Sequence, residues 1–230
     1  MNEKTKECPL CYSLNVNKLI RFHEHVWYKC AGCKNGFKFP YVSELESYSE
    51  DSEVNQTYLN YKNKEELFEN VARRKLEWII SASNKKVKII EIGPGIGVLA
   101  RLALSRNIDY IGVEPSKYFY NYLISNGIPC IGGGDVIVNV KEAIDSCKLD
   151  GLLPVIFLDN VLEHVPDPKS FITKIFHSLP QNGSILVEVP NEYGISFKAW
   201  FSNLIRGQVK PPTFPGHINL FTGQDRKSVV

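Results

Sequence analysis

The stretch of sequence from Lys86 to Ala100 places the strongest constraint on the fold of this chain. It reads K-V-K-I-I-E-I-G-P-G-I-G-V-L-A, so an apolar run is followed by Gly93, Gly95 and Gly97 and then by an apolar pattern of helical spacing. This order predicts a strand, a glycine turn and a helix, which is how a parallel α/β sheet begins. Glycines let the backbone approach a ligand closely, and a helix N-terminus offers unpaired N–H groups. We therefore expect a ligand at this turn.

The identity of that ligand depends on Glu91, near the end of the predicted strand. Gly95, Gly97 and Ala100 fit the dinucleotide fingerprint G-x-G-x-x-G/A. A carboxylate that faces the turn would repel a pyrophosphate, however, and it suits a cation such as an ammonium beside a sulfonium. The pattern E-x-G-x-G-x-G resembles the first motif of class I methyltransferases, which use S-adenosylmethionine (SAM). The resemblance implies that Glu91 and the three glycines Gly93, Gly95 and Gly97 bind SAM; an NAD-dependent enzyme is the alternative.

Two further acids follow predicted strands. Glu114 ends a strand that begins at Tyr110, and it lies 23 residues after Glu91. This is near the ~20-residue offset of an acid that binds ribose hydroxyls. Asp135 follows a third strand, and in the resembled family an acid at about this place binds the adenine amino group; a solvated loop aspartate is the alternative. The glycine loop and the ribose acid also occur in NAD enzymes, so neither separates the two interpretations.

A fourth strand is predicted at 155–158, an uninterrupted apolar run typical of a central parallel strand. The segment that follows it, D-N-V-L-E-H-V-P-D-P, resembles the motif found after the fourth strand of class I methyltransferases. The resemblance implies that Asp159 and Asn160 lie beside the methionine part of SAM. A fifth strand is predicted at 184–189. The resemblance extends over roughly Ile89 to Thr222.

Glu163, His164 and His217 are the candidate catalytic residues. Some relatives that methylate catechol or RNA hydroxyls bind a divalent metal through E-x-x-E-H, but here Asn160 replaces the first acid. His164 could act as a general base, because the ordinary pKa of histidine lies near neutral pH. His217 lies in G-H-I-N-L-F-T, which resembles a segment frequent in type 11 and type 12 methyltransferases, and it could deprotonate an acceptor hydroxyl. The alternative is that these side chains only brace their loops.

The N-terminal region carries two C-x-x-C knuckles with the overall spacing C-x2-C-x18-C-x2-C. The predicted metal ligands are Cys8, Cys11, Cys30 and Cys33. This spacing is typical of a structural four-cysteine zinc site, and the bound metal would supply the folding free energy of so short a segment. Two short strands, at 17–22 and 26–29, complete a predicted zinc ribbon. His23 and His25 are alternative ligands, but four thiolates already close the coordination shell.

Composition limits the class of protein. Lys plus Arg number 27 against 25 for Asp plus Glu in 230 residues. This balance argues against a dedicated nucleic-acid binder. No apolar run approaches the ~20 residues needed to span a membrane, and no secretory leader is visible. We therefore expect a cytoplasmic protein without a membrane partner, in which cysteines serve as metal ligands or core residues.

The sequence thus predicts an α/β protein with a Rossmann-like parallel sheet of the class I methyltransferase type and a small N-terminal zinc ribbon. The expected domains are a zinc ribbon at 1–42, a linker at 43–62 and a SAM-dependent methyltransferase domain at 63–230. The resembled fold has seven strands, so with eight residues after Thr222 the domain is expected to be a fragment or to complete its sheet differently.

The expected reaction is methyl transfer from SAM to a small-molecule acceptor, with structural Zn2+ in the ribbon. The pairing of ribbon and methyltransferase domain resembles sugar methyltransferases, which makes a nucleotide sugar or a glycan the first candidate. Besides an NAD-dependent enzyme, the alternative is a non-catalytic zinc-ribbon binding module with a vestigial SAM fold. The sequence does not indicate an oligomeric state.

Overall fold

The computed structural model describes residues 7–23, 25–39, 64–81, 86–191, 198, 200–203, 205–206 and 216–222. The chain divides into two compact units. The first unit combines Met1–Glu44, Asn160–Thr173 and Val189–Val230, and the second combines Leu45–Asp159 and Lys174–Glu188. The predicted linker at 43–62 and the residues after Thr222 lie outside the described residues.

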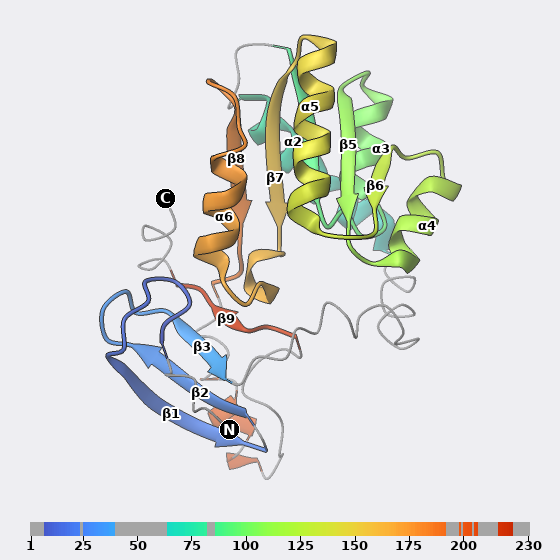
Figure 1. Ribbon diagram of the computed structural model, residues 1–230. Helices are drawn as coiled ribbons and strands as arrows, with labels where there is room; N and C mark the ends of the chain where they lie inside the picture. Colours follow the sequence, from blue (N-terminus) through green and yellow to red (C-terminus); the bar gives the residue numbers. More distant parts are fainter. Residues whose placement is uncertain are drawn as a thin grey trace. The chain divides into compact units, whose positions relative to one another are not determined.

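The second unit is built on a parallel five-stranded sheet with the order β6-β5-β4-β7-β8 (Figure 1). The strands are β4 (Val87–Ile92), β5 (Asp109–Glu114), β6 (Cys130–Gly132), β7 (Leu153–Asp159) and β8 (Ser184–Glu188). All five were expected from the sequence. The order reverses between β4 and β7, and at such a point open α/β sheets bind ligands at the carboxyl ends of their strands.

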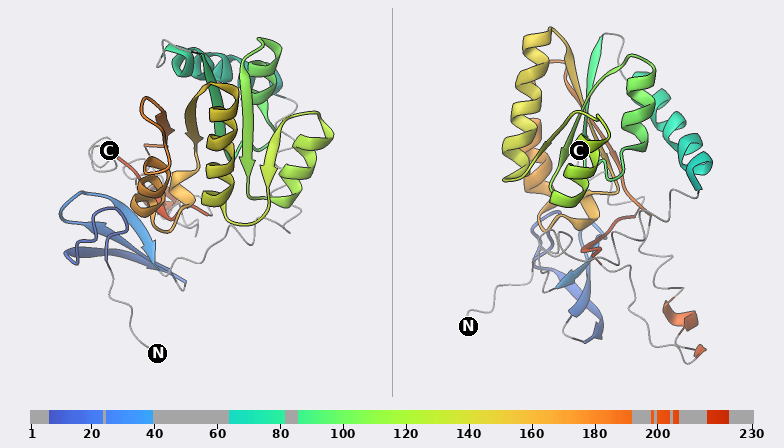
Figure 2. Two further views of the ribbon diagram at one scale, coloured as in Figure 1. Left: turned by 45° about the horizontal axis from the view of Figure 1, so that its top comes forward. Right: turned by 90° about the vertical axis from the view of Figure 1, so that its right-hand side faces the viewer.

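Helices cover both faces of this sheet. They are α2 (Glu65–Ser81), α3 (Val98–Ser105), α4 (Lys117–Ser125) and α5 (Val136–Asp150). Figure 2 shows, in its right-hand view, α2 and α3 on one face and α5 on the other. A further helix, α6 (Pro168–Phe176), begins in the first unit and ends in the second. None of the described helices is long and apolar enough to cross a lipid bilayer.

Helix α2 buries one of its faces and leaves apolar residues on the other. The side chains of Leu67, Val71 and Ile80 are exposed. The residues that pack against the sheet are Ala72, Leu76 and Ile79, which join the core with Ile89 of β4. The strands of the sheet, rather than the number of apolar residues, decide which face of an amphipathic helix turns inward.

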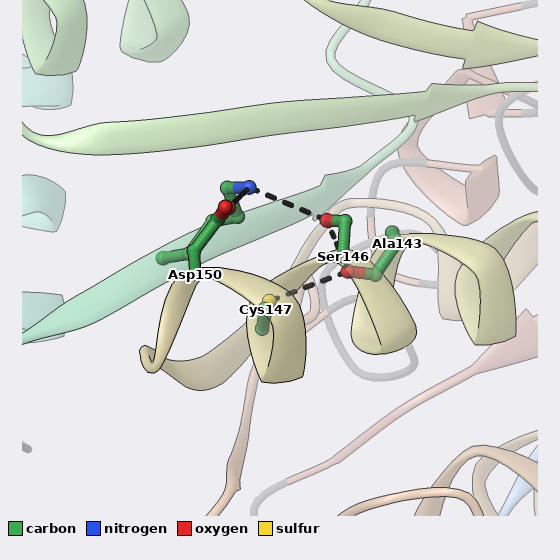
Figure 3. A network of polar contacts seen from close by, with 5 residues as sticks. Ala143, Ser146, Cys147 and Asp150 are labelled. Atoms are coloured by element: carbon green, nitrogen blue, oxygen red, sulfur yellow. Dashed lines mark hydrogen bonds and ion pairs between the residues drawn. The ribbon is translucent and has the colours of Figure 1, made fainter.

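The amino-terminal end of the sheet is held by a polar contact between β4 and α5 (Figure 3). The Lys88 ammonium lies 2.5 Å from Asp150 Oδ2 and donates to Ser146 Oγ at 3.3 Å. Cys147, beside them on α5, is buried and donates to the Ala143 carbonyl at 3.3 Å. Cys147 is therefore a core residue.

The first unit contains an antiparallel sheet with the order β1-β2-β3-β9. Its strands are β1 (Val16–Phe22), β2 (His25–Cys30), β3 (Gly36–Phe39) and β9 (Asn219–Leu220). The first two confirm the predicted strands of the ribbon. The other two were not expected, and β9 brings a segment near the end of the sequence against β3, with Phe37 opposite Asn219.

The core of this unit is small. Its fully buried residues include Trp27, Phe37, Ile218 and Leu220, and the Tyr28 ring stacks on Phe37 with centroids 5.6 Å apart. A short 3-10 helix, η3 (Leu162–His164), also belongs to the unit and contacts β9. The first unit is therefore assembled from three separate stretches of the sequence.

Candidate functional site

The carboxyl edge of the parallel sheet gathers four acids. They are Glu91 of β4, Glu114 of β5, Asp159 of β7 and Glu188 of β8, each at or next to the last residue of its strand. Because the strands are parallel, these ends meet along one edge. Acids at the ends of neighbouring strands suit a ligand that carries positive charge or hydroxyl groups.

The glycine turn lies between β4 and α3 and has the conformation that requires glycine. Gly93, Gly95 and Gly97 have φ angles of 69°, 56° and 72°, in the left-handed region. A side chain on Gly97 would also meet the Ile128 and Leu123 side chains at 2.7 and 2.8 Å. Among the described residues no side chain caps the start of α3. Its first N–H groups can therefore donate hydrogen bonds to oxygen atoms of a ligand.

Glu114 links the end of β5 to the glycine turn. Its two carboxylate oxygens accept the Gly95 N–H at 3.2 Å and the Ser116 N–H at 2.8 Å. Burial raises the pKa of Glu114 to about 7, although the two N–H groups act in the opposite direction. Each carboxylate oxygen has a second lone pair, so Glu114 can still accept from ligand hydroxyls. Its ribose role stays a prediction.

Glu91 is a buried carboxyl rather than an open charge at the tip of its strand. It accepts a hydrogen bond of 2.6 Å from the Tyr110 hydroxyl, and 5% of the residue is exposed. Burial raises its pKa to about 7, while the Tyr110 hydroxyl and the Lys75 ammonium partly offset that effect. An arriving cation would favour the ionised form of this carboxyl.

Lys75 on α2 provides an ammonium for the acids of β7 and β8. Its Nζ lies 2.7 Å from both oxygens of Asp159 and 3.2 Å from Glu188 Oε1. Burial acts to lower the pKa of Lys75, but the hydrogen bond and charge of Asp159, aided by Glu188, give a net rise. The carboxylates of Asp159 and Glu188 thus already bind one ammonium group, that of the Lys75 side chain.

The raised pKa values of Glu91 and Glu114 predict that the ligand-free protein loses stability as pH rises from about 4.5 to about 7. Over that range the folded protein holds protons that the unfolded chain releases, so unfolding becomes easier as pH increases. The loss is at most about 3 kcal/mol for each group.

Thermal melts between pH 5 and pH 8 measure this effect, with the variant Glu91→Gln as the control. The amide copies the protonated carboxyl, so the melting temperature of the variant should fall less over the range. Equal slopes for the two proteins would contradict the assignment.

Two other predicted ligand residues have local roles in the structure. Asp135 caps α5, because its Oδ1 accepts the N–H groups of Ile137 at 2.7 Å and Val138 at 3.1 Å. Asn160, directly after β7, has a φ angle of 52° and is exposed. The adenine role of Asp135 and the methionine role of Asn160 stay predictions.

The three candidate catalytic residues lie together in the first unit. The ligand atoms of Glu163, His164 and His217 are all within 4.8 Å of one another. Glu163 is fully buried, and the two imidazole rings meet edge to face with centroids 4.8 Å apart. Their loops are joined by a hydrogen bond from the Ile218 N–H to the Glu163 carbonyl at 2.8 Å. Residues that are 53 positions apart in the sequence are thus neighbours.

The four ribbon cysteines form the second cluster of the first unit, and all four sulfurs lie within 4.8 Å of one another. The Cys8–Cys33 and Cys11–Cys30 sulfur pairs are each 3.5 Å apart. Tetrahedral coordination with bonds of ~2.3 Å needs sulfurs ~3.8 Å apart, so the donor set fits a zinc ion. The hydrogen bond between Cys8 and Cys33 lowers the pKa of the Cys8 thiol and raises that of the Cys33 thiol, and burial raises the pKa of the Cys11 thiol.

Sequence reasoning did not identify Lys75, Tyr110 or Glu188. A signal for Lys75 was present, because it follows Ala72 by three positions and precedes Leu76, so it falls on the buried face of α2. A lysine on such a face needs an acidic partner. Tyr110 could be found only from the register of the sheet, which places Gly112 opposite Glu91 and Tyr110 two residues before it.

The comparison with solved structures shows the fold. A SAM-dependent methyltransferase from Archaeoglobus fulgidus is 17% identical with a TM-score of 0.50, over 75% of this chain and 71% of that chain. A possible histamine N-methyltransferase from Thermotoga maritima is 17% identical with a TM-score of 0.43, over 74% of this chain and 75% of that chain. The plantazolicin methyltransferase, solved with S-adenosylhomocysteine (SAH), is 16% identical with a TM-score of 0.48, over 73% of this chain and 63% of that chain.

A comparison with family models also gives a match. The model described as "Methyltransferase domain" matches residues 59–229. No curated protein sequence matches the chain.

Proposed function

The chain belongs to the methyltransferase domain family and has the fold of a SAM-dependent methyltransferase, and on that premise we propose that it methylates a small-molecule acceptor through a hydroxyl group. A nucleotide sugar or a glycan is the first candidate acceptor. The observation that carries the proposal is the glycine turn, flanked on both neighbouring strands by acids at the carboxyl edge of the sheet.

The residues of this edge fit the charges and hydroxyls of SAM. Glu114, already bonded to the turn, would accept the ribose hydroxyls, and Asp135 would bind the adenine amino group. Asp159 and Asn160 would lie beside the methionine part, whose ammonium would share the carboxylates that Lys75 now holds. Glu91 would supply negative charge behind the glycines Gly93, Gly95 and Gly97 once a bound cation favours its ionised form.

SAM would supply an activated methyl group on a sulfonium centre. The chain's own residues then need to align the acceptor with that methyl group and to take up the proton that an acceptor hydroxyl loses. Glu163, His164 and His217 are the proposed groups for this proton. The four cysteines would hold a structural Zn2+, which their sulfur separations support.

Binding calorimetry on the purified chain tests the choice of cofactor. We expect SAH to bind with micromolar affinity and NADH to give no binding heat, because the acids of the edge disfavour a pyrophosphate. Binding of NADH without SAH would overturn the assignment. Transfer of labelled methyl from SAM to a panel of nucleotide sugars then tests the acceptor class and separates an enzyme from a vestigial fold.

A further inference from the structure

The cluster of Glu163, His164 and His217 has the composition and placement of a metal site. A fully buried carboxylate and two half-buried imidazoles present their donor atoms within 4.8 Å of one another. Two histidines and one carboxylate form a ligand set that binds zinc or iron(II) and leaves coordination positions open. All three residues belong to the first unit, so the cluster does not depend on how the two units are placed.

A hydrogen bond orients the His164 ring for a metal. Its Nδ1 lies 3.0 Å from the Gly216 carbonyl oxygen. A carbonyl can only accept, so Nδ1 carries the proton and the lone pair is on Nε2. Metal-binding histidines usually donate their other N–H to a carbonyl or carboxylate in this way, which sets the tautomer and the orientation of the ring.

The two segments that carry the ligands are held together by their backbones. The Ile218 N–H donates to the Glu163 carbonyl at 2.8 Å, and the Ile218 carbonyl accepts the Lys38 N–H at 2.9 Å. The buried Asn219 side chain donates to the Val165 carbonyl at 2.7 Å. This support limits the cost of ordering the ligands when an ion binds.

From these observations we propose that Glu163, His164 and His217 bind one divalent transition-metal ion, distinct from the ion of the four-cysteine cluster. Nitrogen ligands select zinc, iron(II) or cobalt over magnesium and calcium, which prefer oxygen ligands alone.

This inference deepens the proposed function, on which its chemical consequence rests. An ion held by three protein ligands has room for an acceptor oxygen and would lower the pKa of a bound hydroxyl. The acceptor class that fits is therefore a sugar or another alcohol that can place an oxygen on the metal. With the ion bound, the three side chains are ligands and no longer take up this proton themselves, so the proton leaves the acceptor oxygen for solvent, and no oxidant or reductant is needed.

Metal counting on the full chain tests the proposal. The chain is stripped, loaded with excess zinc, freed of unbound ions and measured for zinc per chain by mass spectrometry. We expect two ions in the wild-type protein, and one in each of Glu163→Gln, His164→Gln and His217→Gln. The exposed His177 lies outside the cluster, so His177→Gln is the matched control and should keep two.

Cobalt substitution identifies which ion is lost, because thiolate ligands give intense charge-transfer bands and nitrogen and oxygen ligands do not. The cluster variants should keep the thiolate bands. A wild-type count of one ion, or cluster variants that keep two, would overturn the proposal. A variant that fails to fold loses the thiolate bands as well, and the other two variants then decide the question.

The count needs neither SAM nor methyl transfer. A protein without the second metal ion can therefore still bind SAH, and a protein that does not bind SAH can still hold two ions. The two measurements thus test the two proposals separately.

Discussion

Replacing Cys30 with serine is expected to release the ribbon metal and to unfold the four-stranded sheet of the first unit. Cys30 is fully buried at the end of β2, and its sulfur lies 3.5 Å from Cys11 Sγ. The core around Trp27 and Phe37 is too small to stabilise this segment alone. A structural zinc ion contributes about 10–16 kcal/mol of binding free energy to such segments, so its loss exceeds any stability that the core provides.

Zinc analysis and limited proteolysis measure the outcome. The variant should hold no tightly bound zinc in the four-cysteine cluster, and proteases should cut between residues 7 and 39 within minutes. Cys130→Ser is the matched control, because Cys130 is half-buried in β6 of the other unit and outside the cluster. A Cys30→Ser protein that keeps a full equivalent of zinc at the thiolates and resists proteolysis would show that the ribbon is not metal-dependent.

The Cys30→Ser substitution is also expected to affect residues of the first unit outside the ribbon. The Cys30 N–H donates to the Asn35 carbonyl at 2.9 Å, and the Asn35 amide donates to Asn219 Oδ1 at 3.3 Å. Asn219 lies two residues after His217. Loss of the ribbon ion is therefore expected to displace His217 as well, and an unfolded ribbon should lower binding at the Glu163 cluster.

Replacing Glu114 with alanine is expected to weaken SAH binding by about 100-fold or more. Two hydrogen bonds to a charged acceptor, each of about 1.5–3 kcal/mol, are lost at the proposed ribose site. The substitution also removes the acceptor that holds the Gly95 N–H, so the glycine turn loses its link to β5. Calorimetric titration of the variant with SAH gives the change in affinity directly.

Asp109 provides the matched control for this measurement. It is an exposed acid at the opposite end of the same strand. Asp109→Asn therefore removes one carboxylate, as Glu114→Ala does, but far from the edge of the sheet that carries Glu114. We expect its affinity for SAH to stay within twofold of the wild type. Unchanged affinity in Glu114→Ala, with circular dichroism confirming the fold, would refute the ribose role.

The elements of the sheet could be predicted because their signals are local. The strand at Val87–Ile92 is an apolar run that ends at a glycine turn, and the helix at Lys117–Ser125 begins after Ser116, whose side chain accepts the Phe119 N–H. Likewise, Pro168 begins α6, and Asp167 accepts the Ser170 N–H at 2.9 Å. Each of these signals acts through neighbours in the sequence, so tertiary contacts were not needed to read them.

The strands β3 and β9 could not be predicted in the same way. They are four and two residues long, too short to show the alternation of a half-buried strand. Their pairing joins Phe37 to Asn219, across nearly the whole sequence. No local pattern specifies such a contact, which forms because both segments share one small core.

By itself, the sequence determined the parallel sheet, the glycine turn with its flanking acids and the four-cysteine spacing, since each depends on the order of nearby residues. Only the tertiary structure decided that Lys75 joins Asp159 and Glu188, that Glu91 is buried against Tyr110, and that His217 meets Glu163 and His164. The physical reason is that charge pairing and burial depend on which side chains the packed strands and loops bring together. The separation of two residues in the sequence does not predict whether they meet in this way.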